Sequence, residues 1–301
     1  MLPGSPDDSP QVGSGGGPQA CYRHPERETG VSCGRCGRPL CPDCMTGAAV
    51  GFQCPECVRE AGAQGRPATG RFGGRPVRPG RPGRAVAPVT AVLAGLNVLV
   101  FLLTEYLAPA WQLRLGLYSY VPAPGVSIGV AAGPEQWYRL LTSAFVHAGF
   151  AHLATNLVSL LVLGPPLERA LGRVRFLGLY LLSGLAGNAL AFLVDGGSLY
   201  SVGASGAIFG LLGATVVLVR YDRAPLGPVV ALLVFNLVVT FSVRWIDWRA
   251  HIGGLVAGAV MAAGLVYAPR EHRRLVQGLT AAAVLALVLG TMLLGMARLG
   301  A

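Results

Sequence analysis

The chain contains no lysine, and it carries few charges of any kind. All 24 of its basic residues are arginine, against 14 acidic residues among 301. Charged residues make up only 13% of the sequence, whereas a soluble domain has roughly 25%. Apolar residues make up 52%, and glycine occupies a further 43 positions. This composition excludes a collagen-like chain, a disulfide scaffold and a wholly disordered protein, and it predicts a protein that lies largely in lipid.

Cysteine is also absent from most of the chain. All seven cysteines lie between Cys21 and Cys57, in close pairs. An odd number of cysteines, with no apolar signal-peptide core near Met1, argues against a secreted disulfide framework and favours a reducing compartment.

Four regions follow one another along the chain. Residues 1–20 are rich in Gly, Pro, Ser and Asp, so we expect a disordered tail. Residues 21–60 hold the cysteines and form the expected zinc-binding module. Residues 61–87 are a linker of Gly, Pro and Arg, which favours neither helix nor sheet. Residues 88–301 form the expected membrane domain.

The cysteine pairs have the spacing of zinc ligands. Four Cys-x2-Cys or Cys-x2-His knuckles supply eight ligands, which is the number that two tetrahedral Zn²⁺ ions need. Only four residues separate Cys36 from Cys41, so we expect these neighbouring knuckles to serve different ions in a cross-braced arrangement. The predicted ligand sets are Cys21, His24, Cys41 and Cys44 for one ion, and Cys33, Cys36, Cys54 and Cys57 for the other.

This spacing resembles the B-box class of zinc fingers. So small a segment has too little core to fold unaided, so both zinc ions are expected to be structural. The alternative reading is four chance or redox-active cysteine pairs, which is disfavoured because His24 completes the octet of ligands. A module of this kind is expected to bind a cytoplasmic protein partner.

Long apolar stretches fill the rest of the chain. A helix needs about 20 apolar residues to cross a hydrocarbon core near 30 Å thick. A mixed segment with Trp and Tyr over residues 109–140 is typical of a membrane interface. The sequence therefore predicts an all-α polytopic membrane protein. The expected spans are residues 88–108, 149–167, 175–194, 203–220, 225–243, 250–268 and 276–297.

Arginine in the connecting loops predicts the orientation. Loops on the side of the N-terminus hold more arginine than those on the other side, which favours a cytoplasmic N-terminus and an outer C-terminus. The inner set is Arg169, Arg173, Arg175, Arg220, Arg223, Arg270, Arg273 and Arg274, and the outer set is Arg114, Arg139, Arg244 and Arg249.

The linker arginines fit the same orientation. They precede the first apolar stretch, where they can face anionic lipid headgroups. Nucleic-acid binding is disfavoured, because this stretch has one aromatic residue, Phe72, and no recognisable binding fold. Arginine-only usage in an Ala- and Gly-rich chain is typical of a GC-rich bacterial genome, so we expect a bacterial cell membrane.

Four polar residues within the apolar stretches point to chemistry, because polar groups in lipid are expensive. They are His152 and Asn156 in the second span, Ser205 at the start of the fourth and His251 at the start of the sixth. These three spans run in the same direction, so all four residues are expected at similar depth toward the outer side. Each residue alone would usually be a packing residue, but the four at matched depth favour a site.

The four residue types suit acyl transfer. A neutral imidazole can take the proton of a serine hydroxyl near pH 7, so His251 is the expected base for Ser205. His152 and Asn156 lie four residues apart, on one helix face, and can donate to an oxyanion. Gly203 and Gly206 give backbone room beside Ser205, and small residues at Gly254 and Gly258 let two helices approach closely.

The sequence resembles the rhomboid family of intramembrane serine proteases over about residues 88–270, which would form a six-helix core followed by a seventh helix. The segments that carry the resemblance are Trp137-Tyr138-Arg139, His147-x4-His152-x3-Asn156, Gly164-x3-Glu168-x3-Gly172, Gly203-Ala204-Ser205-Gly206 and Ala250-His251-Ile252-Gly253-Gly254.

The resemblance implies a Ser205–His251 dyad without a catalytic acid, an oxyanion site of His152, Asn156 and the Ser205 amide, and no metal in catalysis. It also implies membrane-protein substrates that reach the site laterally, near the second and fifth spans. Two positions depart from the family pattern: Tyr138 separates Trp137 from Arg139, and Phe209 stands where many bacterial members have Tyr.

Two other classes of function remain as alternatives. A catalytically inert relative could bind or route membrane proteins, although such proteins usually lack the nucleophile or the base. A transporter would be expected to show inverted repeats and broken helices, and the sequence shows neither.

Overall fold

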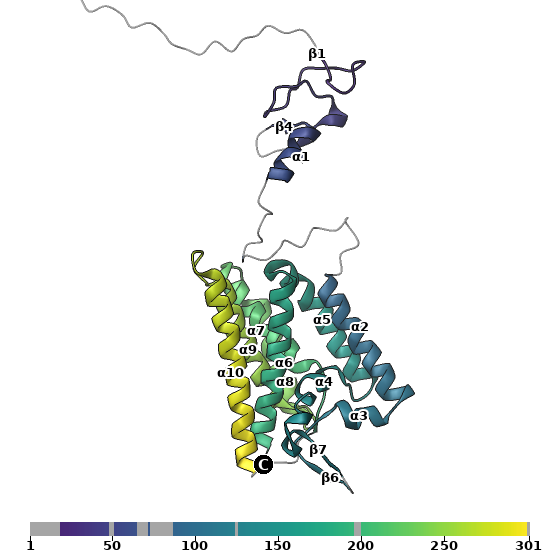
Figure 1. Cartoon of the computed structure of the whole chain (residues 1–301), viewed down its shortest axis with the longest axis vertical. Helices are drawn as coiled ribbons and strands as arrows, with labels where there is room; N and C mark the ends of the chain where they lie inside the picture. The colour runs from purple at the N-terminus through teal and green to yellow at the C-terminus, as the bar shows by residue number, and fades with distance from the viewer. Residues whose placement is uncertain are drawn as a thin grey trace, which may run out of the picture. The chain divides into compact units, whose positions relative to one another are not determined.

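A computed structural model describes residues 19–47, 51–64, 72, 87–123, 126–195 and 200–299 (Figure 1). The chain divides into two compact units, Met1–Ala68 and Thr69–Ala301. The predicted tail, except residues 19–20, lies outside the described residues. So does most of the predicted linker, where 61–64, Phe72 and Ala87 are described.

The first unit is a small module of short elements. Two antiparallel pairs form it, β1 (Gln19–Ala20) with β2 (Glu28–Thr29) and β3 (Thr46–Gly47) with β4 (Phe52–Gln53). A 3-10 turn, η1 (Pro42–Cys44), and one helix, α1 (Pro55–Gln64), complete it. Its buried apolar cluster consists of six cysteines and Leu40, with Tyr22 and Met45 packed against them. A core made almost entirely of cysteine has little apolar area with which to offset the entropy of folding.

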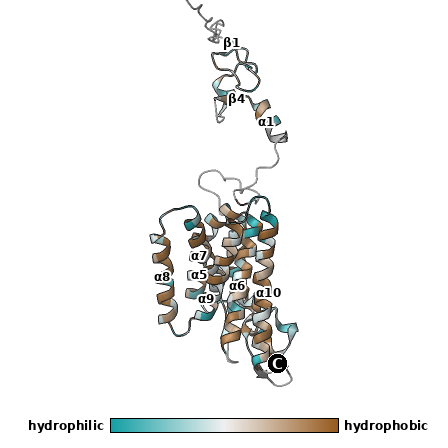
Figure 2. Cartoon of the chain, turned by 90° about the vertical axis from the view of Figure 1, so that its left-hand side faces the viewer, coloured by the Kyte–Doolittle hydropathy of each residue, from teal (hydrophilic) through white to brown (hydrophobic). Residues whose placement is uncertain are grey.

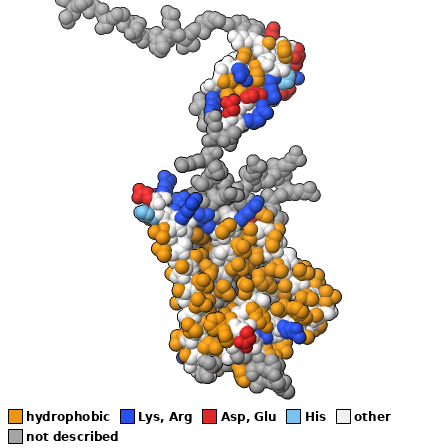
Figure 3. Space-filling model, viewed as in Figure 1, with side chains coloured by type: hydrophobic (Ala, Val, Ile, Leu, Met, Phe, Trp, Pro, Cys, Tyr) orange, Lys and Arg blue, Asp and Glu red, His pale blue; other side chains and the backbone are white. Residues whose placement is uncertain are grey.

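Among the described residues of the second unit, seven apolar helices dominate, and each lies within a few residues of a predicted span. Five are long and apolar enough to cross a membrane, whereas α7 and α8 are shorter, at 17 and 16 residues. Figure 2 shows the apolar character of these helices, and Figure 3 shows apolar side chains over most of the unit's visible face. The helices are α2 (Pro88–Leu102, continued by a π-helical turn η2, Leu103–Leu107), α5 (Phe150–Leu171), α6 (Arg173–Asp195), α7 (Ser205–Tyr221), α8 (Gly227–Ser242), α9 (Trp248–Val266) and α10 (Arg273–Leu299).

The segment between α2 and α5 is built from short pieces, and these include strands, so the all-α prediction is incomplete. Arg139 organises this segment. Its guanidinium is only 4% exposed and donates from Nη1 to the carbonyls of Leu113 and Gly116, at 2.7 and 3.0 Å. The pieces are α3 (Ala110–Leu115), β5 (Leu117–Tyr118), β6 (Val121–Ala123), β7 (Val126–Ile128), η3 (Val130–Ala132), η4 (Pro134–Gln136), α4 (Arg139–Thr142) and η5 (Ser143–Phe145).

Strand β5 pairs antiparallel with β8 (Tyr200–Ser201), which immediately precedes α7. The rings of Tyr118 and Tyr200 lie 4.9 Å apart across this pair. The interfacial segment is thus fastened to the chain just before Ser205.

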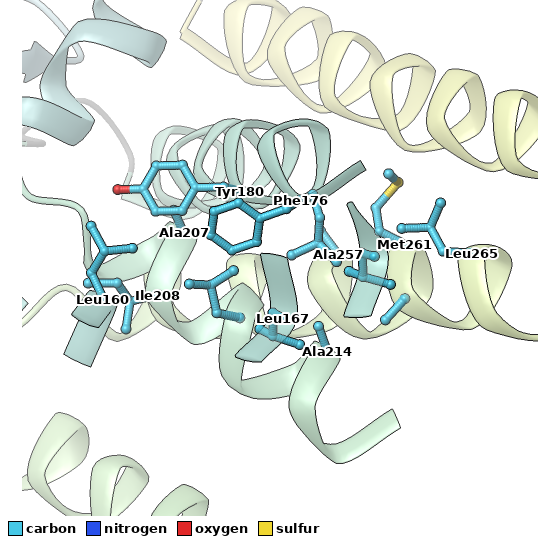
Figure 4. Close-up of a cluster of buried hydrophobic side chains, with 14 of the residues drawn as sticks. Leu160, Leu167, Phe176, Tyr180, Ala207, Ile208, Ala214, Ala257, Met261 and Leu265 are labelled. Carbon is cyan, nitrogen blue, oxygen red and sulfur yellow. The ribbon is translucent and has the colours of Figure 1, made fainter. Parts of the chain in front are cut away.

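Helices α7 and α9 approach each other through glycine. A Cβ atom at Gly254 would collide with the Gly206 carbonyl oxygen, and one at Gly258 would collide with that of Gly210. The pairs 206/254 and 210/258 advance together, so the two helices run in the same direction, as predicted. The packed side chains around this contact include Ala207 and Ile208 of α7 and Ala257 of α9 (Figure 4).

Two polar contacts fasten the ends of the helices. Glu168 is fully buried near the end of α5 and accepts hydrogen bonds from the backbone N–H groups of Val89 and Thr90, at 3.0 and 2.8 Å. It thereby caps the positive end of α2, which is a structural role. In α10, Gln277 donates from Nε2 to the carbonyls of Phe72 and Leu265, at 3.2 and 2.9 Å.

We expect Gly254→Ala to destabilise the membrane unit by about 3 kcal/mol, because the new methyl group meets backbone that cannot move aside. Thermal unfolding in detergent measures this. Gly290→Ala is the matched control, since nothing lies within 4 Å of a Cβ at that position on α10. Equal unfolding temperatures for the two variants would contradict close packing of α7 on α9.

Candidate active site

Ser205 is the first residue of α7 and is partly exposed. The residue after it lies against α9, because a Cβ at Gly206 would be 3.2 Å from the carbonyl oxygen of Ala250. Ala250 directly precedes His251. The backbone that carries the serine therefore contacts the backbone that carries the predicted base.

The ring of His251 stacks on α7. Its centroid lies 4.1 Å from that of Phe209, with 16° between the ring planes. Phe209 is one helical turn beyond Ser205, so the imidazole lies beside the first turn of α7. His251 itself is only 6% exposed. The aromatic ring at position 209 thus offers a face to His251.

The predicted oxyanion residues, His152 and Asn156, lie against Gly203 in the loop that precedes Ser205. Gly203 has a φ of 116°, which L-residues rarely adopt, and a Cβ there would be 2.6 Å from the His152 ring and 3.7 Å from Asn156 Nδ2. Asn156 also donates from Nδ2 to the His152 carbonyl, at 3.0 Å. An amide group carries two hydrogens, so one remains for a further acceptor. Glycine at 203 is required both by its φ and by the approach of the imidazole.

A hydrogen-bonded support holds this loop in place. The Gly203 N–H donates to the Ser143 carbonyl, at 2.9 Å. Asn188 of α6 donates from Nδ2 to the Ser143 hydroxyl and to the Leu140 carbonyl, at 3.0 and 2.7 Å. Sequence patterns did not identify Asn188, because a single buried amide in a long apolar helix carries no spacing signal.

His147 is completely buried, and its Nδ1 lies 3.1 Å from the Phe145 carbonyl oxygen. Since a carbonyl oxygen only accepts, Nδ1 carries the proton. Its ring meets that of His152 edge to face, with centroids 5.1 Å apart. These contacts favour a structural role for His147.

Asp247 caps the helix that carries His251. It is the N-cap of α9 and accepts from the backbone N–H groups of Arg249 and Ala250, at 3.1 and 3.4 Å. Its side chain is only 16% exposed. Short polar side chains satisfy the free N–H groups at a helix start, which explains the placement.

Thr240 of α8 was missed altogether. Its hydroxyl lies 2.8 Å from His251 Nδ1. A threonine in a membrane helix normally bonds the carbonyl four residues back, so no sequence pattern singles Thr240 out.

Comparison with known proteins identifies the family to which this arrangement corresponds. The rhomboid domain matches residues 134–268, which include every residue of the site. YdcA, a rhomboid-family protein of Bacillus subtilis (strain 168), is 38% identical over 142 residues, which are 46% of this chain and 70% of YdcA. The chain belongs to the rhomboid family.

Two other rhomboid relatives match over a smaller part of their length. Rhomboid protease GluP of B. subtilis is 39% identical over 168 residues, which are 54% of this chain and 32% of GluP. RHOMBOID-like protein 5 of Arabidopsis thaliana is 38% identical over 144 residues, which are 45% of this chain and 46% of that protein. The chain is therefore a multi-pass membrane protein of the rhomboid type, although it spans half or less of these two relatives.

Outside the rhomboid match, the first unit brings its eight predicted ligands into two groups. In each group the four ligand atoms lie within 4.8 Å of one another, and the groups are those of the predicted cross-brace. A tetrahedron with Zn–S bonds of about 2.3 Å has edges of about 3.8 Å. Cys36 Sγ and Cys54 Sγ lie 3.7 Å apart, and His24 Nδ1 lies 3.2, 3.4 and 3.8 Å from the sulfurs of Cys41, Cys44 and Cys21. The donor set and its spacing therefore fit zinc.

The thiols differ in how readily they ionise. Burial opposes ionisation of Cys21, but hydrogen bonds from the backbone of Arg23 and Cys41 outweigh it and lower the pKa of this thiol to about 6. Burial likewise opposes ionisation of Cys33, and hydrogen bonds, the largest from the Cys54 backbone, lower its pKa to about 6. Each group thus contains at least one thiol whose pKa is lowered, and thiolate is the form that binds metal.

Proposed function

We propose that this rhomboid is an intramembrane serine endopeptidase that cleaves other membrane proteins in or near their transmembrane segments. The observation that carries the proposal is that side chains of α5 and α9 meet at the start of α7, where Ser205 lies. His251 stacks beside the turn that Ser205 begins, and Gly203 fits under the His152 ring. The names of rhomboid relatives such as GluP, and the presence of both nucleophile and base, favour an enzyme over an inert relative.

In the proposed mechanism, His251 takes the proton of the Ser205 hydroxyl as its oxygen attacks the scissile carbonyl. The negative charge that develops on the carbonyl oxygen is met by the Ser205 N–H, His152 and Asn156. The protonated imidazole then gives its proton to the leaving amine. Water, activated by the same imidazole, hydrolyses the acyl-enzyme and restores the serine. No step needs a metal ion.

The substrate helix is proposed to reach the site between α5 and α8. Helix α8 packs only lightly on α7 and α9, and Figure 2 shows it standing apart from α7. Its outer side chains are exposed, including Phe235 at 64% and Phe241 at 61%. In a membrane these side chains face lipid, so a single-span substrate could approach this side without crossing a polar barrier.

We also propose that the arginine-rich end of the membrane unit faces the cytoplasm. Helices α5, α7 and α9 end there (Figure 1), and Figure 3, in the same view, shows Arg side chains gathered at this end. By the positive-inside rule the site then opens toward the outer side of a bacterial cell membrane, with the C-terminus outside.

Ser205→Ala should abolish cleavage of a single-span substrate in its outer juxtamembrane region. The rate should fall by at least about 10³-fold, because the nucleophile is lost. Reconstituted protein and gel analysis of the fragments measure this, with Ser159→Ala on α5 as a matched serine control. Cleavage by the Ser205→Ala variant at the wild-type rate would falsify the enzyme proposal, and an inactive wild-type protein would favour an inert relative.

We further propose that each ligand group of the first unit holds one structural Zn²⁺, and that the folded module binds a cytoplasmic protein partner. The support is the tetrahedral spacing of the ligand atoms and a core that offers little besides cysteine. Zinc binding would then supply much of the folding free energy of this unit.

Elemental analysis of the full-length, reduced chain should find two zinc ions per chain. Replacing Cys33 and Cys36 together by Ser should remove one ion and leave the other, because each group is complete by itself. Ser32→Ala, next to Cys33, is the control and should retain two. Unchanged zinc content in the double variant, or a wild-type chain without zinc, would contradict the proposal.

A further inference from the structure

Thr240 occupies an unusual position for a residue of α8. All residues of α8 are described, and Thr240 is the only buried one among them, at 3% exposed. Thr240 is thus the one side chain of α8 that is buried inside the membrane unit. The hydroxyl of that side chain lies 2.8 Å from the imidazole Nδ1 of His251.

The hydrogens at this contact can be counted. The Thr240 hydroxyl lies 2.7 Å from the Asn236 carbonyl oxygen and donates its one hydrogen there. Its lone pair then faces His251 Nδ1 at 2.8 Å, which must supply the hydrogen between them. A neutral imidazole carries one N–H, so Nε2 is left with a free lone pair.

Two contacts together fix the imidazole. Stacking on Phe209 sets the plane of the ring, and the bond to Thr240 sets its rotation within that plane. A base that accepts the proton of a neighbouring hydroxyl must have both the correct orientation and an unprotonated nitrogen on the correct side. The contacts with Phe209 and Thr240 provide the orientation, and the bond to Thr240 also determines which nitrogen is unprotonated.

We propose that Thr240 is a positioning residue for the dyad: its hydroxyl keeps the proton of His251 on Nδ1, so that Nε2 serves as the base for Ser205. This inference rests on the proposed function. When the imidazole becomes protonated during the reaction, Nδ1–H still donates to the same hydroxyl, so the oxygen also stabilises the cation. A hydroxyl does this without placing a carboxylate charge in lipid, where a charge is expensive.

Thr240→Val tests the proposal, because it keeps the shape of the side chain and removes the acceptor. We expect kcat to fall about tenfold or more, the effect of losing one buried hydrogen bond to the base, with KM nearly unchanged. Thr240→Ser restores the hydroxyl and should restore kcat. Thr215→Val is the matched control, because Thr215 on α7 bonds only the Leu211 carbonyl four residues back, at 2.8 Å.

The outcomes separate this inference from the function beneath it. Cleavage that persists in Ser205→Ala would remove the proposed function itself. Cleavage that needs Ser205 but proceeds at the wild-type kcat in Thr240→Val would overturn only the role of Thr240. A loss in Thr240→Val that Thr240→Ser does not repair would also overturn it, since packing alone would then explain the loss.

A second measurement needs no change at Thr240, so its result does not depend on whether a Thr240 variant folds. NMR of the histidine ring nitrogens in the wild-type protein, with the His251 signals assigned by their loss in His251→Gln, reports which nitrogen carries the hydrogen. Neutral His251 protonated at Nδ1 is the expected result. Protonation at Nε2 would refute the proposal, because that nitrogen could not then accept a proton from Ser205.

Discussion

The contact of glycine on glycine between α7 and α9 is the constraint on which the candidate site depends. Carbonyl oxygens of one helix lie where the other helix would carry a Cβ, at Gly254 and Gly258. In lipid there is no hydrophobic effect between helices, so close van der Waals contact and polar bonds must hold them. The same contact brings the start of α7 beside the first turn of α9, and hence Ser205 beside the residues around His251.

Much of this arrangement follows from sequence. The spans were predictable because lipid requires long apolar helices, and the approach of α7 to α9 because Gly206, Gly210, Gly254 and Gly258 recur at four-residue spacing. The grouping of the cysteines was predictable because four residues between Cys36 and Cys41 leave adjacent knuckles little chance to share one ion. In each case the residue type and the spacing along the chain are enough to predict which segments come together.

The parts that sequence did not predict depend on contacts between distant segments. The pairing of β5 with β8 joins residues 117–118 to 200–201, and nothing in either pair of residues specifies the other. Phe72 seemed only the lone aromatic residue of a linker, yet it is 4% exposed and meets the ring of Tyr221 at 5.6 Å. The contact of Thr240 with His251 and the cap formed by Asp247 were not predicted, because hydroxyls and carboxylates near helix ends have ordinary local uses, and only the fold shows which use applies.

The light packing of α8 has a consequence for control. On the proposed mechanism, α8 has two roles: a substrate would pass beside it to reach the site, and its Thr240 orients the base, His251. Any outward swing of α8 takes the Thr240 oxygen away from the imidazole and leaves the ring held by its stack alone. The site would then be open to a substrate but would lack an oriented base. His251 would regain its orientation only when α8 returns to its position after the substrate has entered. On the proposed mechanism, hydrolysis would then require a substrate that lets α8 pack back against α9 before the peptide bond is attacked.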